Sequence, residues 1–358
     1  MERVFSRLID PVFRPTVRAL HGWALAAMIS NAVVIATGAA VRLSSSGLGC
    51  PDWPNCTKSS DFASHSSGQS LLNSWIEFGN RLLNFPLVAI AGLAFIAFYM
   101  WHRQQKAAGA DGRVDLVWLS AVLPIGVVAQ AVIGGIVVLT KLNPALVAVH
   151  FLLSTAIILT SAVVLHARTV ALEKASLAAA ASQPGDGQAP GGGAQIVRTD
   201  QRVLAGLLTA VTGLMLAAGT VVTGTGPLAG TEIDSHGHLT TVPRFHFSLA
   251  SVTQLHADIG WFIGALTVAL VVGLRYSGAP RRTVRLGWVV LVGLGLQGII
   301  GYLQYFNHLP AGLVWVHVAL AVLIWIYVLQ LYLSTTVGLG AVAAERVAAP
   351  SPEAVSAP

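Results

Sequence analysis

The sequence contains little charge. Only 10% of its 358 residues are Asp, Glu, Lys or Arg, against about 25% in an ordinary soluble domain. Hydrophobic residues make up 54%, and the mean hydropathy is +0.70. This balance excludes an ordinary soluble domain and indicates a chain that lies largely within a membrane.

Eight stretches of the sequence are almost free of charge. Each has about 20 residues or more, enough for a helix to cross a hydrocarbon core of about 30 Å. We therefore predict an all-α integral membrane protein with eight transmembrane helices. The predicted spans are Trp23–Val41, Leu72–Trp101, Leu116–Leu139, Ala145–Leu165, Val203–Val222, Leu249–Leu274, Gly287–Tyr305 and Gly312–Leu333.

Positive charge is distributed unevenly among the loops. With eight spans, sixteen of the 21 Lys and Arg residues fall on the side of both termini, and Arg81 falls inside a span. The opposite side has only Arg42, Lys58, Lys141 and Arg244. Short cytoplasmic loops retain positive charge, so both termini are predicted to be cytoplasmic. The net charge of +6 is thus explained by topology, and no nucleic-acid partner is predicted.

Low-complexity sequence divides the predicted spans four and four. Residues 175–196 are rich in Gly, Pro, Ser and Gln and carry too little apolar surface to pack. A similar composition at the end of the chain predicts a disordered tail. The predicted organisation is a cytoplasmic N-terminal segment at 1–19, a four-helix bundle at 20–168, a flexible cytoplasmic linker at 169–200, a second four-helix bundle at 201–336 and a cytoplasmic tail at 337–358.

The two predicted halves share a spacing of polar residues. In the first half Gln130-x3-Gly134 precedes His150, and in the second Gln297-x3-Gly301 precedes His317. The distance from Gln to His is 20 residues in both.

A second correspondence relates Gly38-x3-Arg42 to Gly219-x3-Thr223, at the end of the first span of each half. Because each half has four spans, both halves enter the membrane from the same side. The repeat therefore predicts two pseudo-symmetric bundles related by an axis along the membrane normal.

Three histidines lie inside predicted spans. His150, His256 and His317 each sit about two turns into an even-numbered span, so they share one depth near the outer face. Haem iron can take two imidazoles from facing helices of a bundle. His256 and His317 form the natural pair in the second half. Alternatively, each histidine merely hydrogen-bonds a neighbouring helix, as polar groups in membranes do.

The first half offers a different set at the same depth. Its corresponding positions are Asn80 and His150, so only one strong iron ligand remains there. Glu77 lies one helical turn before Asn80 and would face the same cavity. An ionisable residue inside a membrane is costly and is by default a functional candidate. The alternative is an interfacial carboxylate paired with Arg81, four residues on.

The chain has only two cysteines, Cys50 and Cys56, both in the first outer loop. An exported compartment favours their oxidation, so we predict a disulfide. Two unrelated thiols are the alternative. The place of the loop above the first half leaves both a structural and a redox role open.

Several stretches together resemble one known family. They are Gly38-Ala-Ala-Val-Arg42-Leu, Ser46-Gly-Leu-Gly-Cys50-Pro-Asp-Trp53-Pro-x-Cys56, Glu77-x-x-Asn80-Arg81, Gln130-x3-Gly134-Gly135, His150-Phe151, Gly219-Thr-Val-Val-Thr-Gly-Thr-Gly-Pro227, His256 and His317. In these stretches the chain resembles haem A synthase, the membrane enzyme that converts haem O into haem A for cytochrome oxidases. The resemblance covers all eight spans.

The resemblance implies a role for each half. The C-terminal half would hold a haem b cofactor through the iron ligands His256 and His317. The N-terminal half would bind haem O as substrate, with His150 ligating or positioning the iron and Asn80 and Arg81 beside it.

Glu77 would be the catalytic residue as one porphyrin methyl group is oxidised to an alcohol and on to the hydrated aldehyde. Members with a complete pattern carry histidine where this chain has Asn80. This departure makes bis-histidine ligation of the substrate doubtful and leaves the expected reaction unchanged. The pair Cys50 and Cys56 is typical of the subgroup with a disulfide in this loop.

An oxidoreductase acting on a CH or CH2 group, in a bacterial plasma membrane, is thus expected, with haem sites toward the outer face. Its expected partners are haem O, haem A, the lipid bilayer, an electron acceptor or donor, haem O synthase and cytochrome oxidase assembly factors. A membrane b-type cytochrome exchanging electrons with quinol, or a haem carrier without turnover, would also use a bis-histidine pair. The cytochrome would need neither Glu77 nor the single His150, and the carrier predicts haem binding without turnover.

Overall fold

The computed structural model describes residues 10–58, 60–63, 70–181, 197–233 and 239–336. In that part of the chain, eight helical stretches are long and apolar enough to cross a membrane, and each predicted span lies inside one of them. The expected all-α membrane fold is therefore confirmed. The duplication and the cytoplasmic placement of the termini stay predictions.

The first four spans are built from six helices and one π-helical turn. Their bounds are α2 Val17–Leu43, α3 Leu71–Leu82, α4 Asn84–Ala107, α5 Val114–Leu139, α6 Pro144–Leu153, the π-helical segment η1 Ser154–Leu159 and α7 Thr160–Ala181.

The last four spans are single helices, and a short hairpin follows the first of them. Their bounds are α8 Thr199–Thr225, the 3-10 turn η2 Pro227–Ala229, β1 Thr231–Ile233, β2 Leu239–Thr241, α9 Leu249–Tyr276, α10 Arg281–Phe306 and α11 Ala311–Thr335. The strands β1 and β2 are antiparallel, with Glu232 opposite Thr240.

Side-chain caps define where several spans begin. Thr16, Ser70, Asn143 and Ser248 each accept a hydrogen bond from a backbone N–H two or three residues ahead. Such caps satisfy donors that a helix leaves free at its first turn. In lipid this matters more, because no water is present to replace the missing partner.

The second span is broken at Leu83, which the sequence analysis did not predict. Pro86 has no N–H to bond the carbonyl of Leu82, and its ring disfavours a continuous helix through this point. Helix α3 consequently ends at Leu82 and α4 begins at Asn84. The break separates the short helix that carries Glu77 from the longer one below it.

The predicted start of the linker at residue 169 is wrong, because α7 continues to Ala181. The segment is rich in Ala and Leu, which have high helix propensity, and this outweighs its low share of large apolar side chains. Residues 182–196 of the predicted linker lie outside the described residues, as do 1–9 of the N-terminal segment and the tail at 337–358.

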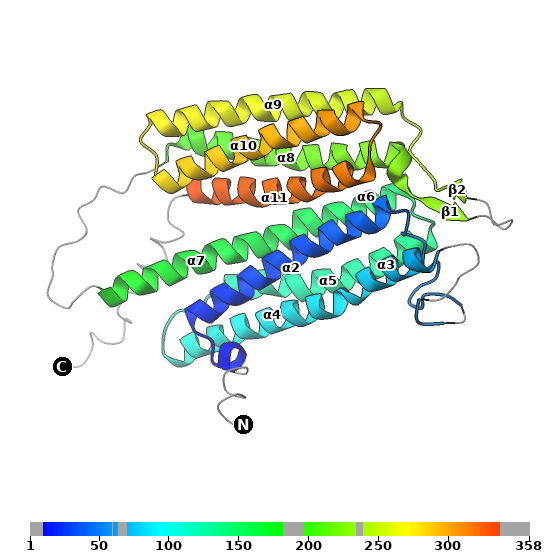
Figure 1. Ribbon diagram of the computed structural model, residues 1–358. Coiled ribbons are helices and arrows are strands. Elements are labelled where there is room, and N and C mark those ends of the chain that lie inside the picture. Colours follow the sequence, from blue (N-terminus) through cyan, green and yellow to red (C-terminus); the bar gives the residue numbers. More distant parts are fainter. Residues whose placement is uncertain (1–9, 59, 64–69, 182–196, 234–238, 337–358) are drawn as a thin grey trace, which may run out of the picture.

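Figure 1 shows α2–α7 as one group of roughly parallel helices and α8–α11 as a second group beside it. The strands β1 and β2 and the loop between α2 and α3 lie together at one end, which we call the hairpin end. The groups meet where α11 packs on α2 and α7 and where α6 packs on α8. The first span of each group therefore contacts the fourth span of the other.

Two tryptophans of α11 bond the backbone of the first group. Trp315 donates its indole N–H to the carbonyl of Ala36 on α2, at 2.9 Å. Trp325 donates to the carbonyl of Thr155, at 3.1 Å, and lies 3.2 Å from the hydroxyl of Thr160. Thr155 is in the π-helical segment, where the widened turn alters the usual backbone ladder. The buried Trp325 thus supplies a donor from the neighbouring group.

This contact gives a testable prediction for stability. Trp325→Phe keeps an aromatic ring but removes the indole donor to the Thr155 carbonyl, which still accepts a hydrogen bond from the Thr160 hydroxyl. The free energy of unfolding should therefore fall by about 0.5–1.5 kcal/mol. Thermal unfolding in detergent measures the change. Trp118→Phe is the matched control, since Trp118 is 71% exposed on α5. Equal effects of the two substitutions would contradict the role of the indole.

Candidate functional site

A cavity of about 2120 Å³ lies between the helices and is lined by both groups. Pockets for a single drug-sized ligand are typically about 300–1,000 Å³. The cavity therefore has room for two large ligands. All six predicted site residues line it, namely Glu77, Asn80, Arg81, His150, His256 and His317.

His256 on α9 and His317 on α11 face each other across the second group. Their ring centroids are 6.3 Å apart and their planes are inclined by 53°. A metal between two imidazoles is about 2 Å from each ligating nitrogen. Two nitrogen–metal bonds, together with the distance from each ligating nitrogen to the centroid of its ring, add up to about the observed separation of the centroids. The pair is thus spaced as axial ligands of one iron would be.

Each of the three histidines is packed against a glycine of a neighbouring helix. A Cβ atom built on the glycine would lie 3.3 Å from the Cε1 atom of the ring, a close contact: Gly134 at His150, Gly219 at His256 and Gly301 at His317. These glycines are the ones that recur in the sequence repeat. Their spacing is explained by the need to bring an imidazole ring directly against a helix backbone.

The cavity wall holds polar atoms without partners. Among the described residues, buried atoms of this kind that belong to cavity-lining side chains are Nδ1 of His150, His256 and His317, Oδ1 of Asn80, and Oε1 of Gln130, Gln297 and Gln304. Buried polar groups are normally hydrogen-bonded, so a cluster of unsatisfied ones is unusual. Each of these atoms is covered by the surrounding helices and has no protein partner.

The donor set fits haem better than a bare metal ion. In the described ranges, no three His, Cys, Asp or Glu side chains converge on a common point suited to a metal. Two imidazoles alone give too few ligands for a tightly bound ion. A haem iron brings four porphyrin nitrogens of its own and requires only axial ligands from the protein.

Asn80 is the position at which the first group differs. Its repeat counterpart His256 packs on Gly219, whereas nothing lies within 4 Å of a Cβ built on the matching Gly38. Both Asn80 and Gly38 line the cavity. The shorter amide therefore leaves space where the second group has a ring. Among the described histidines of the first group, His150 alone lines the cavity.

Both carboxylate oxygens of Glu77 accept a hydrogen bond. Arg81 donates from Nη2 to Oε1 at 2.6 Å, and the backbone N–H of Cys50 donates to Oε2 at 2.7 Å. Only 6% of the Glu77 side chain is exposed. The ion pair with Arg81, raised as the alternative to a catalytic role, is thus present, and Glu77 lines the cavity as well.

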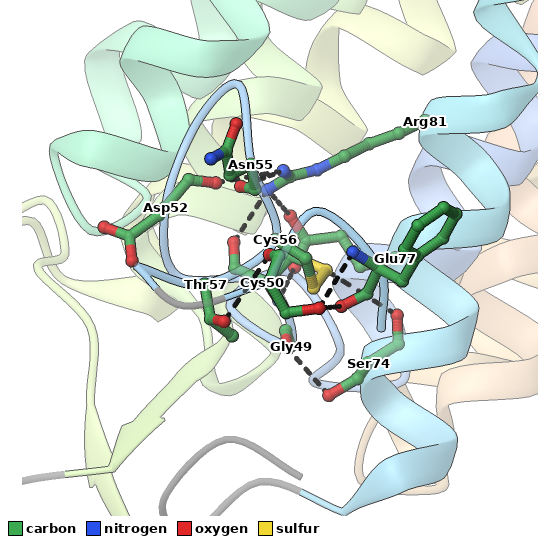
Figure 2. Close-up of a disulfide and its surroundings, with 11 residues drawn as sticks. Gly49, Cys50, Asp52, Asn55, Cys56, Thr57, Ser74, Glu77 and Arg81 are labelled. Carbon is green, nitrogen blue, oxygen red and sulfur yellow. Dashed lines mark hydrogen bonds and ion pairs between the residues drawn. A yellow bond between two sulfur atoms is a disulfide. The ribbon is translucent and has the colours of Figure 1, made fainter. Parts of the chain in front are cut away.

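Cys50 and Cys56 form a disulfide, as predicted, and Figure 2 shows how it is held above α3. Arg81 donates to the carbonyls of Cys50, Asp52 and Asn55 at 2.7, 2.9 and 3.2 Å. Both cysteines are buried. Arg81 therefore binds the loop and Glu77 at once, and the disulfide closes the loop around its guanidinium.

The loop also approaches α3 through its backbone. The hydroxyl of Ser74 donates to the carbonyl of Gly49 at 2.8 Å. A Cβ on Gly49 would lie 2.5 Å from the carbonyl oxygen of Asn73, so only glycine fits there. The loop is seated directly on the helix that carries Glu77 and Asn80.

Trp53 is a further lining residue that sequence reasoning did not single out. Its ring lies where a side chain on Gly135 would be, so the indole covers the backbone of α5. Gly135 and Trp53 both belong to motifs of the sequence analysis. Nothing in their spacing indicated that they touch.

The family model described as cytochrome oxidase assembly protein (COX15-CtaA) matches residues 21–329. This chain belongs to that family. Together with the eight apolar helices, membership shows a multi-pass membrane protein.

Similar curated proteins carry the name Heme A synthase. One, from Lysinibacillus sphaericus (strain C3-41), is 31% identical over 137 residues, and one from Geobacillus thermodenitrificans is 28% identical over 140 residues. Each match covers 38% of this chain and 40% of the relative. The chain thus aligns with about two fifths of the length of these relatives.

The space beside Gly38 yields a prediction for Asn80→His. The added ring has room in the cavity and should supply a second axial ligand to a haem held by His150, which shifts that haem toward a low-spin spectrum. Optical spectra of the purified variant loaded with haem O measure the shift. Gln130→His is the control, because it adds an imidazole elsewhere in the same wall. An unchanged spectrum for Asn80→His would show that position 80 does not face the iron.

Proposed function

We propose that this chain is a haem A synthase, which oxidises a methyl group of haem O stepwise to the formyl group of haem A. The observation that carries the proposal is one cavity with two unequal ligand sets. A facing histidine pair lies in the second group, and a single histidine with a buried carboxylate lies in the first. The names of the similar proteins support the same reaction.

In this proposal the two halves have separate tasks. The C-terminal half, residues 201–336, holds haem b between His256 and His317. The N-terminal half, residues 20–168, binds haem O with its iron at His150 and its edge near Asn80 and Arg81. When bound, haem b supplies one-electron transfer. The unequal ligand sets suit this division, because a cofactor iron needs both axial positions filled and a substrate does not.

Glu77 is the proposed catalytic group of the first half. Oxidation of a methyl group develops positive charge or releases a proton at that carbon, and a carboxylate within reach can stabilise the charge or accept the proton. Arg81 and the Cys50 N–H hold the carboxylate in one orientation. Arg81 would thus position Glu77, and the disulfide loop would position Arg81.

Conversion of the methyl to the formyl group adds one oxygen atom. With water as its source, four electrons and four protons leave for an electron acceptor, and with O2 as its source the reaction takes electrons from a donor. The proposed redox partner is therefore an electron acceptor or donor. Haem O synthase and cytochrome oxidase assembly factors are the proposed protein partners, because they would deliver haem O and take up haem A. We place the protein in a bacterial plasma membrane with the hairpin end outside. The distribution of Lys and Arg among the loops supports this orientation.

The histidine pair by itself would also suit a membrane b-type cytochrome or a haem carrier. One experiment separates the three functions: expression together with a supply of haem O, followed by chromatography of the extracted haems. Haem A should appear only when the chain is present. Unchanged haem O in membranes that contain folded, haem-loaded protein would contradict the proposed enzyme and favour an electron carrier.

The cofactor assignment predicts the effect of removing either ligand. His256→Ala or His317→Ala should abolish most of the low-spin b-type spectrum of the purified protein, because one imidazole cannot hold both axial positions. His150→Ala is the matched control and should retain that spectrum. A normal low-spin spectrum in both second-half variants would refute the assignment.

The assignment of Glu77 predicts that Glu77→Gln lets haem O accumulate without haem A and leaves the low-spin spectrum intact. Glutamine still accepts a hydrogen bond from the Cys50 N–H, so the loop should stay seated. Glu232→Gln removes a carboxylate that pairs with Lys141 at the hairpin end and does not line the cavity, and it should have no effect on yield. Haem A at wild-type yield from Glu77→Gln would reduce Glu77 to a structural partner of Arg81.

A further inference from the structure

Arg42 is a cation at the junction of the two groups. It lies in the last turn of α2, and its half-buried side chain reaches the end of α8. Nε donates to the carbonyl of Ala229 at 3.3 Å, Nη1 to the hydroxyl of Thr223 at 3.2 Å and Nη2 to the carbonyl of Thr223 at 3.3 Å. The repeat had aligned Arg42 with Thr223, and the structure brings these two positions into contact.

These hydrogen-bond partners of Arg42 are all neutral. In the described part of the chain, no carboxylate lies within ion-pair distance of its guanidinium, although Arg42 lines the cavity. Arg81, the other arginine of the lining, is paired with Glu77. A cation removed from water without a counter-charge is costly. The wall therefore carries positive charge that a bound anion would neutralise.

The hydrogen-bond inventory of Arg42 leaves room for such an anion. A guanidinium has five N–H donors, and the three bonds to Ala229 and Thr223 use one each on Nε, Nη1 and Nη2. One donor on Nη1 and one on Nη2 remain. Each of these donors can bond an oxygen of an anion, and a hydrogen bond between a guanidinium and a carboxylate is stronger than one between neutral groups.

The depth of Arg42 relates it to the iron ligands. His150, His256 and His317 lie six or seven residues from the starts of α6, α9 and α11, about 9–10 Å along the helix axis. Arg42 lies at the hairpin end of α2, which is the end where those helices begin. A haem standing upright between the helices would have one edge toward the hairpin end. A haem carries its two carboxylates, the propionates, on a single edge.

We propose that Arg42 binds a propionate carboxylate of a haem in this cavity and so fixes which edge of the macrocycle faces the hairpin end. This inference rests on the proposed function, since it requires a haem at one of the two histidine sites. The carboxylate belongs either to the substrate haem or to the cofactor haem. Both have the same chemistry, and the position of Arg42 between the groups gives access to each.

Binding measurements with esterified haems test the proposal directly. Protein produced under haem limitation is titrated in detergent with haem O and with iron protoporphyrin IX, each as the free acid and as the dimethyl ester. The wild-type chain should bind the acid of one of them about ten- to hundredfold more tightly than the ester, the range expected for hydrogen bonds to a charged group. Arg42→Gln should weaken binding of that acid and abolish the preference.

The ligand whose preference disappears identifies the source of the carboxylate. Loss with haem O alone assigns Arg42 to the substrate, and loss with iron protoporphyrin IX alone assigns it to the cofactor. Arg244→Gln is the matched control: it removes another positive charge of the hairpin end, and Arg244 does not line the cavity. This control should keep the full preference for the acid.

The proposal is overturned if Arg42→Gln keeps the wild-type preference for the acid with both ligands. Arg42 would then only hold α2 to α8 through its hydrogen bonds to Thr223. Should Arg42→Gln fail to accumulate, Arg42→Met carries the test, because it keeps an unbranched side chain without charge or N–H donors, and the preference must fall. If neither haem binds the wild-type chain, the proposed function itself fails. That outcome is distinct from binding without acid preference.

Discussion

The structure depends on the close contact between imidazole rings and glycine backbone inside a membrane bundle. A polar side chain among apolar helices needs both space and a partner. Gly134, Gly219 and Gly301 provide the space, because any side chain there would meet a histidine ring. The partner is absent from the protein itself, since Nδ1 of each ring is buried without a hydrogen bond. The rings are thus positioned by packing against glycine and not by hydrogen bonds to Nδ1.

The two groups differ in how many histidine rings they present to the cavity. In the second group, paired rings 6.3 Å apart leave space for one iron. In the first, Asn80 and Gly38 both line the cavity, and nothing lies within 4 Å of a Cβ built on Gly38. The loop closed by Cys50 and Cys56 is seated on α3. The buried ion pair of Glu77 with Arg81 lies on this side. A half that holds a cofactor firmly and a half that admits a substrate would differ in this way.

Much of this was predictable, because eight apolar runs, three intramembrane histidines and two cysteines in one loop are strong local signals. The spacing of the glycines was also visible, but its reason was not, since the contact of Gly219 with His256 joins separate helices. The break at Leu83 and the π-helical turn near Thr155 depend on backbone bonding that periodicity does not report. The reach of Arg81 across the disulfide loop likewise required coordinates.

In the proposed function, one cavity binds two haems with different axial ligation. Electron paramagnetic resonance of the oxidised, purified protein loaded with haem O tests it most directly. The account predicts a low-spin signal that requires His256 and His317 and a second, spectroscopically distinct haem signal that requires His150. A single haem signal at saturation, or two signals that both survive His150→Ala, would contradict it.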